Sequence, residues 1–187
     1  RARGMYPAEL DGGALEEAHR VAPAVLRGPL ARVFREWDTV QQSQQAGYET
    51  GDEIPERFLR TLQAANTAMA EHFAATPDAS QGPLQRFFFD ALHFARLAEA
   101  FGDHSVFERT LGTTQQARRL AIRNLVPAPF LQGRFVEAAS VTCFSGTLSP
   151  FEFYRDALGL PEDTALLDVA SPFHSAQLRV EVAMDVS

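Results

Sequence analysis

Three small residues that could do chemistry follow an apolar run near the carboxyl end of the chain. The run, residues 139–144 (ASVTCF), is rich in β-branched and aromatic residues and predicts a strand covered on both faces. Ser145, Gly146 and Thr147 would then lie at its carboxyl end, where ligands gather in parallel sheets. Two hydroxyls can exchange hydrogen-bond partners there, and a glycine lets the backbone flex. The alternative is an ordinary turn, because small polar residues dominate turns.

The neighbours of Ser145 do not support a nucleophilic serine. A strand–helix elbow needs glycine two residues before and two residues after the serine, but Cys143 and Thr147 occupy these positions. We expect Cys143 to be a small buried hydrophobe within the strand. As the only cysteine, it excludes an internal disulfide and a cysteine-rich metal site built from this chain alone. We therefore predict no catalytic residue and no metal site.

Arginine supplies all 17 basic side chains of the sequence. The absence of lysine excludes a Walker A phosphate loop and lysine Schiff-base chemistry. The net charge of −7 argues against general adhesion of the whole chain to phosphate backbones. Arg118, Arg119 and Arg123 nevertheless form a local cluster, and arginine can hold phosphates and stack on bases without reading sequence. The alternative is that these arginines lie on a solvated face or pair with acids.

Amphipathic helices are predicted through the first 115 residues. Apolar residues recur at helical spacing, with Asp11, Pro29 and Pro83 near helix starts. The expected helices are residues 11–21, 29–45, 55–76 and 83–101, with a loop at 46–56. Helices of this length must bury their apolar stripes against each other or against another domain.

The pattern changes after residue 114. Residues 119–125, 139–146, 164–173 and 177–186 are strand-like, whereas 129–138 and 149–159 are helix-like. Alternating strands and helices predict parallel pairing. In the last helix, Ser149 is expected at the N-cap, Pro150 at the first position and Glu152 at the third, as in a capping box. The fold class is therefore mixed α+β: an N-terminal helical bundle followed by a partial α/β segment.

An ordered set of short motifs in this region resembles the helicases of the XPD and DinG type. These are superfamily-two DNA helicases that carry an iron–sulphur cluster, and their motif III has the form Ser-Ala/Gly-Thr-Leu-Ser-Pro. The matching stretches are Ser145 to Pro150, Phe153-Tyr154, Leu158-Gly159-Leu160 and Ser171-Pro172-Phe173. Residues 125–131 (LVPAPFL) resemble the sequence that precedes motif III, and residues 1–11 resemble the segment that follows the DEAH box.

The resemblance implies a domain organisation and a role. Residues 1–115 would be an arch-like helical domain, 116–170 the end of a RecA-like motor domain one with motif III, and 171–187 the start of motor domain two. Ser145, Gly146 and Thr147 would couple the nucleotide site to the path of the DNA. ATP, Mg²⁺ and a 4Fe–4S cluster are expected for the parent protein. No cofactor is expected in this fragment, which we predict to be inactive alone.

The expected partner is single-stranded DNA, bound through the parent protein, and strands without cover could also cause self-association. No apolar run approaches the roughly 20 residues that span a bilayer, so we expect no membrane contact and a cytoplasmic location. The rival hypothesis is a helical protein–protein interaction module with an α/β dimerisation tail. In that hypothesis, exposed aromatics such as Trp37 or Phe58 would anchor the partner.

Overall fold

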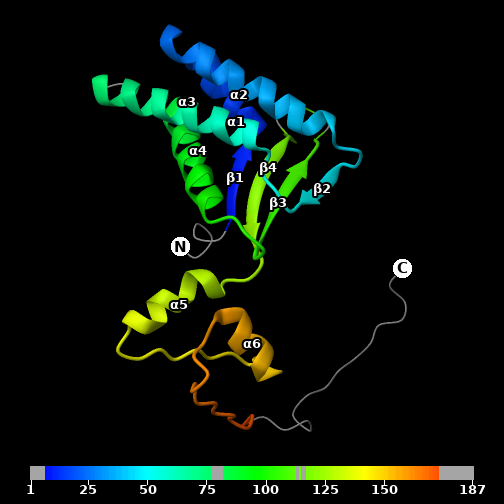
Figure 1. Cartoon of the computed structure of the whole chain (residues 1–187), viewed down its shortest axis with the longest axis vertical. Helices are drawn as coiled ribbons and strands as arrows, with labels where there is room; N and C mark the ends of the chain where they lie inside the picture. Colours follow the sequence, from blue (N-terminus) through cyan, green and yellow to red (C-terminus); the bar gives the residue numbers. More distant parts are fainter. Residues whose placement is uncertain (1–6, 77–81, 113, 115–116, 173–187) are drawn as a thin grey trace.

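The fold is mixed α and β, as the sequence predicts (Figure 1). A computed structural model of the chain describes residues 7–76, 82–112, 114 and 117–172. Its helices are α1 (Gly12–Val21), α2 (Ala24–Gln42), α3 (Glu56–Ala75), α4 (Pro83–Glu99), α5 (Ala128–Glu137) and α6 (Phe151–Leu158). Its strands are β1 (Pro7–Asp11), β2 (Tyr48–Gly51), β3 (Ser105–Thr110) and β4 (Arg119–Asn124).

The sheet is antiparallel, in the order β1-β4-β3-β2. The parallel pairing predicted from strand–helix alternation is therefore wrong for the described residues. Of its strands, the sequence predicts only β4. β2 lies in the loop expected at 46–56, and β1 and β3 lie within the helical domain expected at 1–115, where no strand is predicted. β4 pairs with β1 on one side and with β3 on the other. The sheet thus joins segments on both sides of the boundary expected at residues 115 and 116.

One hydrophobic core lies between the sheet and the helices α1 to α4. Leu120 and Ile122 alternate along β4 and are fully buried. Above them, Phe58 lies between two other aromatic rings, with its centroid 6.1 Å from that of Trp37 and 6.1 Å from that of Phe94. Among the described residues, this buried cluster begins at Ala8 and ends at Ile122. We call this part, residues 7–124, the helical body.

A local sequence signal explains how α1 begins, whereas the start predicted for α2 is wrong. Asp11 is the N-cap of α1, and its Oδ1 accepts a hydrogen bond from the Ala14 N–H at 3.0 Å, as expected. Pro29, predicted at a helix start, instead lies inside α2, which begins at Ala24. The earlier start places Leu26 in the core on the same side as Leu30, and both are fully buried.

The helices α5 and α6 pack on each other below the sheet and form what we call the C-terminal lobe, residues 125–172 (Figure 1). The lobe joins the helical body where the Leu125 N–H donates to the His104 carbonyl at 2.8 Å. The ring of His104 also contacts that of Phe130 at a centroid distance of 5.2 Å. Gly159 ends α6 with φ of 67°, and a side chain there would collide with Ala128.

Two predicted strands do not form in the C-terminal lobe. Residues 139–146 and the described part of 164–173 have no strand pairing, and Phe144 is 92% exposed. A β-branched run becomes a strand only when it pairs with a neighbouring strand, and this segment pairs with none among the described residues. The RecA-like segment therefore stays a prediction. The expected strand 177–186, Phe173 and residues 1–6 lie outside the described residues.

Candidate functional site

Ser145, Gly146 and Thr147 form an exposed turn between α5 and α6, which we call the hydroxyl turn. The Thr147 N–H donates to Ser145 Oγ at 3.2 Å, and the two hydroxyl oxygens also lie 3.2 Å apart. A Cβ built on Gly146 would meet nothing within 4 Å. The segment is thus a turn stabilised by side-chain hydroxyls, with open space around it. Its hydroxyls can exchange these contacts for hydrogen bonds to another surface.

The capping box expected at Ser149 is not present. Helix α6 begins at Phe151, and Pro150 is its N-cap, without a side-chain hydrogen bond to the first turn. The extended backbone of Pro150, with φ of −70° and ψ of 144°, places Ser149 one residue outside the cap position. Glu152 still lies in the first turn of α6, where a carboxylate favours the helix dipole.

Cys143 is exposed, contrary to the prediction of a buried thiol. The reason is the missing strand: without a neighbour on either edge or face, the run around Cys143 stays open to solvent. We expect this thiol to react completely with Ellman's reagent in the native protein. Addition of denaturant should not increase the amount of thiol that reacts, whereas a large increase on unfolding would show that Cys143 is covered in solution.

The three arginines predicted to bind DNA are each paired with acids in the helical body. The ion pairs are Arg118 with Asp38 (2.7 Å), Arg119 with Glu9 (3.3 Å) and Asp11 (3.7 Å), and Arg123 with Glu108 (2.7 Å). This agrees with the alternative interpretation, in which these arginines pair with acidic side chains of the same protein. No hydrogen bond or ion pair among the described residues links them to the hydroxyl turn, which lies in the C-terminal lobe (Figure 1).

The pair of Arg123 and Glu108 belongs to a polar clamp across three strands. Glu108 is only 8% exposed, and both its oxygens accept bonds from Arg123, at 2.7 and 2.9 Å. The Tyr48 hydroxyl donates to the same carboxylate at 2.9 Å. The bond from Arg123 is the largest cause that lowers the pKa of Glu108, and the bond to Glu108 raises the pKa of Tyr48. These interactions link β2, β3 and β4, and they give Arg123 a structural role in the sheet.

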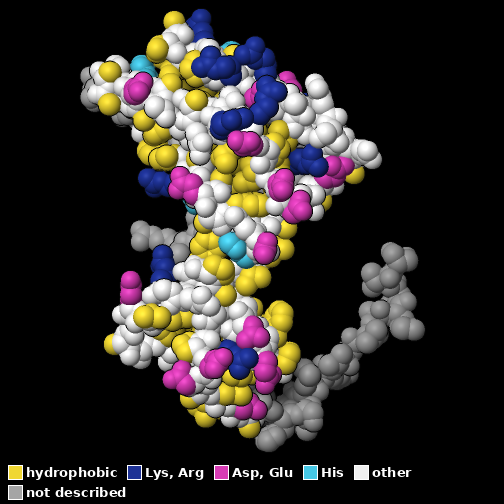
Figure 2. Space-filling model, viewed as in Figure 1, with side chains coloured by type: hydrophobic (Ala, Val, Ile, Leu, Met, Phe, Trp, Pro, Cys, Tyr) yellow, Lys and Arg dark blue, Asp and Glu magenta, His cyan; other side chains and the backbone are white. Residues whose placement is uncertain are grey.

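Another arginine cluster, which sequence reasoning missed, lies on the outer side of α2 and α3. Arg32, Arg57 and Arg60 line a shallow hollow of about 250 Å³ together with Glu36, Thr61 and Ala64. Figure 2 shows arginine side chains gathered over these two helices. The spacing of Arg57 and Arg60 places them on one side of α3, but nothing in the sequence shows that Arg32 lies beside them.

A second hollow, of about 570 Å³, lies between α1 and α4 and has a mixed lining. Its charged residues are Asp11, Glu16, Glu17, Arg20, Arg86 and Asp90. Burial is the largest cause that raises the pKa of Asp90. Within the described ranges, no group of three or more His, Cys, Asp or Glu side chains is arranged to hold a metal ion.

Comparison with known proteins adds no assignment: the chain matches no family model, and no curated protein matches it significantly. No helix in the described part of the chain has both the length and the apolar character needed to cross a bilayer.

Proposed function

We propose that the chain is a section of an ATP-dependent DNA helicase of the XPD and DinG type. The helical body would be the strand-guiding, arch-like part, and the hydroxyl turn would be the coupling element of motif III. The ordered motifs from residue 125 to residue 173 support this proposal. The observation that carries it is the state of the hydroxyl turn, which is open to solvent in a lobe with almost no core of its own.

The surface of the C-terminal lobe is unusually apolar for a part that stands alone. Phe144 is 92% exposed and Leu167 is 84% exposed, while Ala128 is the one residue of the lobe that is buried among those described. Exposed apolar groups on this scale are typical of a surface that other parts of an assembly cover. In the parent helicase, the remaining strands of the motor domain would cover these exposed apolar side chains.

The section would not hydrolyse ATP by itself. ATP, Mg²⁺ and a 4Fe–4S cluster are expected in the parent protein, but the residues present here do not fit these groups. The chain has no lysine for a Walker A loop and one cysteine, whereas such a cluster is held by four thiolates. We therefore assign the hydroxyl turn a coupling role and no catalytic one.

The second candidate is a protein–protein interaction module with a dimerisation tail. The exposed residues of the C-terminal lobe favour it, because they could meet a second copy. The helical body does not favour the interaction module, because the expected anchors Trp37 and Phe58 are 2% and 0% exposed and are part of the core.

The coding sequence upstream of this chain in the parent gene distinguishes the two candidate functions. Upstream of Arg1 we expect a Walker A motif, four cysteines and an aspartate-glutamate-alanine-histidine string. A parent gene without these motifs would overturn the helicase proposal, and self-association of the purified chain would then support the interaction module.

A substitution in the hydroxyl turn tests the coupling role. In the intact helicase, Thr147→Val should lower the rate of unwinding more than the rate of ATP hydrolysis. Valine keeps the shape of threonine but removes the hydroxyl that lies 3.2 Å from Ser145 Oγ. Thr164→Val is the matched control, since the Thr164 hydroxyl bonds to the Pro161 carbonyl in another loop of the same lobe. Equal losses of both activities in T147V would argue against coupling.

A further inference from the structure

The arginine cluster on α2 and α3 differs from the arginines of β4 in how its side chains are held. We call it the α2–α3 groove, lined by Arg32, Arg57, Arg60, Glu36 and Thr61. Three arginines and one glutamate line the hollow, in a chain whose net charge is −7. A local excess of positive charge on an acidic protein is a site where an anion would be held.

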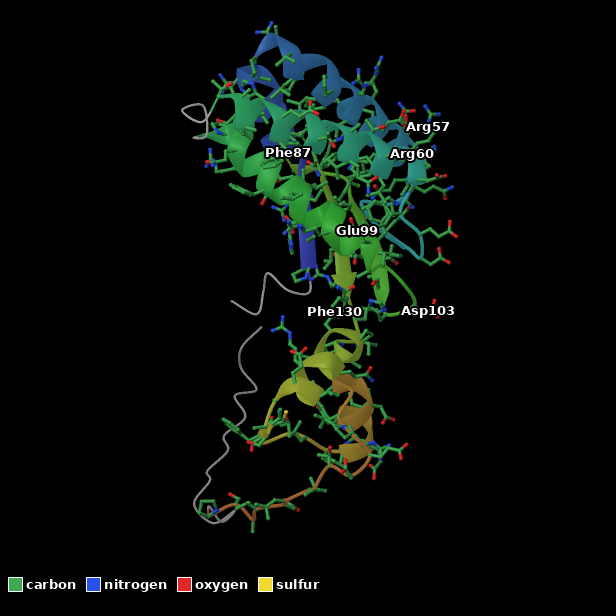
Figure 3. All side chains as sticks on the ribbon, turned by 60° about the vertical axis from the view of Figure 1, so that its left-hand side comes forward. Arg57, Arg60, Phe87, Glu99, Asp103 and Phe130 are labelled. Carbon is green, nitrogen blue, oxygen red and sulfur yellow. The ribbon has the colours of Figure 1, made fainter. Side chains whose placement is uncertain are left out.

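The groups in this groove keep most of their hydrogen-bonding capacity. The Arg57 side chain is 77% exposed and donates from Nη2 to Glu36 at 3.0 Å, which leaves its other donors to solvent. The Arg60 side chain is 65% exposed and lies 3.4 Å from an exposed Glu56 in a surface pair that contributes little. Arg32 is exposed and has no ion pair within the described residues. Figure 3 shows Arg57 and Arg60 side by side at the start of α3.

The Glu36 carboxylate orients this cluster. Its side chain is 18% exposed, and it accepts the bond from Arg57 across the gap between α2 and α3. Arg57 is thereby held over the hollow, whose remaining wall carries Arg32 and Arg60. Guanidinium groups fixed around one hollow can contact successive phosphates, since each presents several donors in a planar fork.

We propose that the α2–α3 groove binds the sugar–phosphate backbone of single-stranded nucleic acid. This inference rests on the proposed function, and it assigns strand contact to Arg32, Arg57 and Arg60 in place of the acid-paired arginines of β4. Contact with phosphates alone carries no sequence information, so the groove would bind strands of any sequence.

The test is a binding titration with a fluorescein-labelled oligothymidylate of about 20 nucleotides, long enough for a single-strand site. The variant Arg32→Gln/Arg57→Gln/Arg60→Gln should bind roughly tenfold or more weakly at low salt, as judged by fluorescence anisotropy. The slope of log affinity against log salt should also fall by about 2, because each phosphate contact on a single strand contributes roughly 0.7. The substituted side chains are exposed, so the circular dichroism spectrum should not change.

Two control variants separate the groove from overall charge. Arg20→Gln/Arg86→Gln/Arg96→Gln removes the same positive charge from exposed positions on α1 and α4 and should bind nearly as well as the unaltered protein. Glu36→Gln removes the negative charge of the groove, and the glutamine amide oxygen can still accept the bond that orients Arg57, so this variant should bind the strand more tightly. A purely structural role of Glu36 would not give that increase.

Several outcomes would overturn the proposal. They are failure of the unaltered protein to bind the strand, equal weakening in both triple variants, equal binding by all variants, and equally tight binding of polyglutamate, which would indicate an acidic protein partner. In each case the helicase proposal is still decided separately, by the upstream motifs and by T147V in the intact enzyme.

Discussion

Replacing Phe58 with alanine should lower the free energy of unfolding of the helical body by about 3–5 kcal/mol. Phe58 is fully buried, and its ring makes edge-to-face contacts with those of Trp37 and Phe94, each at 6.1 Å between centroids. Alanine would remove the ring that connects α2, α3 and α4 and would leave a cavity among side chains that cannot close it. Urea unfolding followed by circular dichroism measures the loss.

Phe89→Ala is the matched control for this prediction. Phe89 lies on α4 and is 56% exposed, so its truncation should change the free energy of unfolding by about 0.5 kcal/mol or less. A comparable loss in both variants would contradict the assignment of Phe58 to the centre of the core. The same conclusion would follow if F58A lowered the free energy of unfolding by less than about 1 kcal/mol.

The helices were predictable because their signals are local. Leu62 and Met69 recur on one face of α3 and are fully buried, and Asp11 lies at the N-cap of α1, as its position before two glycines indicates. A helix satisfies its own backbone hydrogen bonds, so a window of sequence contains most of the information that specifies it.

The strands were less predictable because their identity depends on pairing. β1 offers only Ala8 and Leu10 as inward residues, and β2 (YETG) has no fully buried residue. Both become strands only because β4 and β3 supply edges to them. The run around Cys143 shows the converse, since its composition is strand-like but it pairs with no strand within the described residues and forms no regular structure.

The candidate site was predictable only where its residues are neighbours in the sequence. The hydroxyl turn follows from the local composition of Ser145, Gly146 and Thr147. The acidic partners of Arg118 and Arg119 do not follow from local composition, because Asp38 and Glu9 are far from them in the sequence and meet them only in the folded chain. The α2–α3 groove likewise requires two helices to pack before Arg32 lies near Arg57.

The helical body should become less stable in acid, because protonation of Glu108 removes its ion pair with Arg123. The folded state lowers the pKa of Glu108, with the hydrogen bond from Arg123 as the largest cause. A carboxyl whose pKa is lower in the folded state stabilises the protein fully above its unfolded pKa, and this contribution disappears as the pH falls through the folded-state pKa. The loss should therefore occur below the ordinary pKa of glutamate, about 4.3.

Glu108→Gln isolates this contribution. At neutral pH it should lower the free energy of unfolding by about 1–2 kcal/mol, near the low end for a charged hydrogen bond because the Arg123 side chain is 52% exposed. The difference between E108Q and the unaltered protein should shrink as the pH falls, because acid protonates Glu108 and removes the same charge. Glu17→Gln is the control, since Glu17 is half exposed and lies 3.7 Å from Arg20 on the surface of α1. A difference for E108Q that stays constant from neutral to acidic pH would show that the glutamine disturbs packing and that the charge of Glu108 contributes nothing.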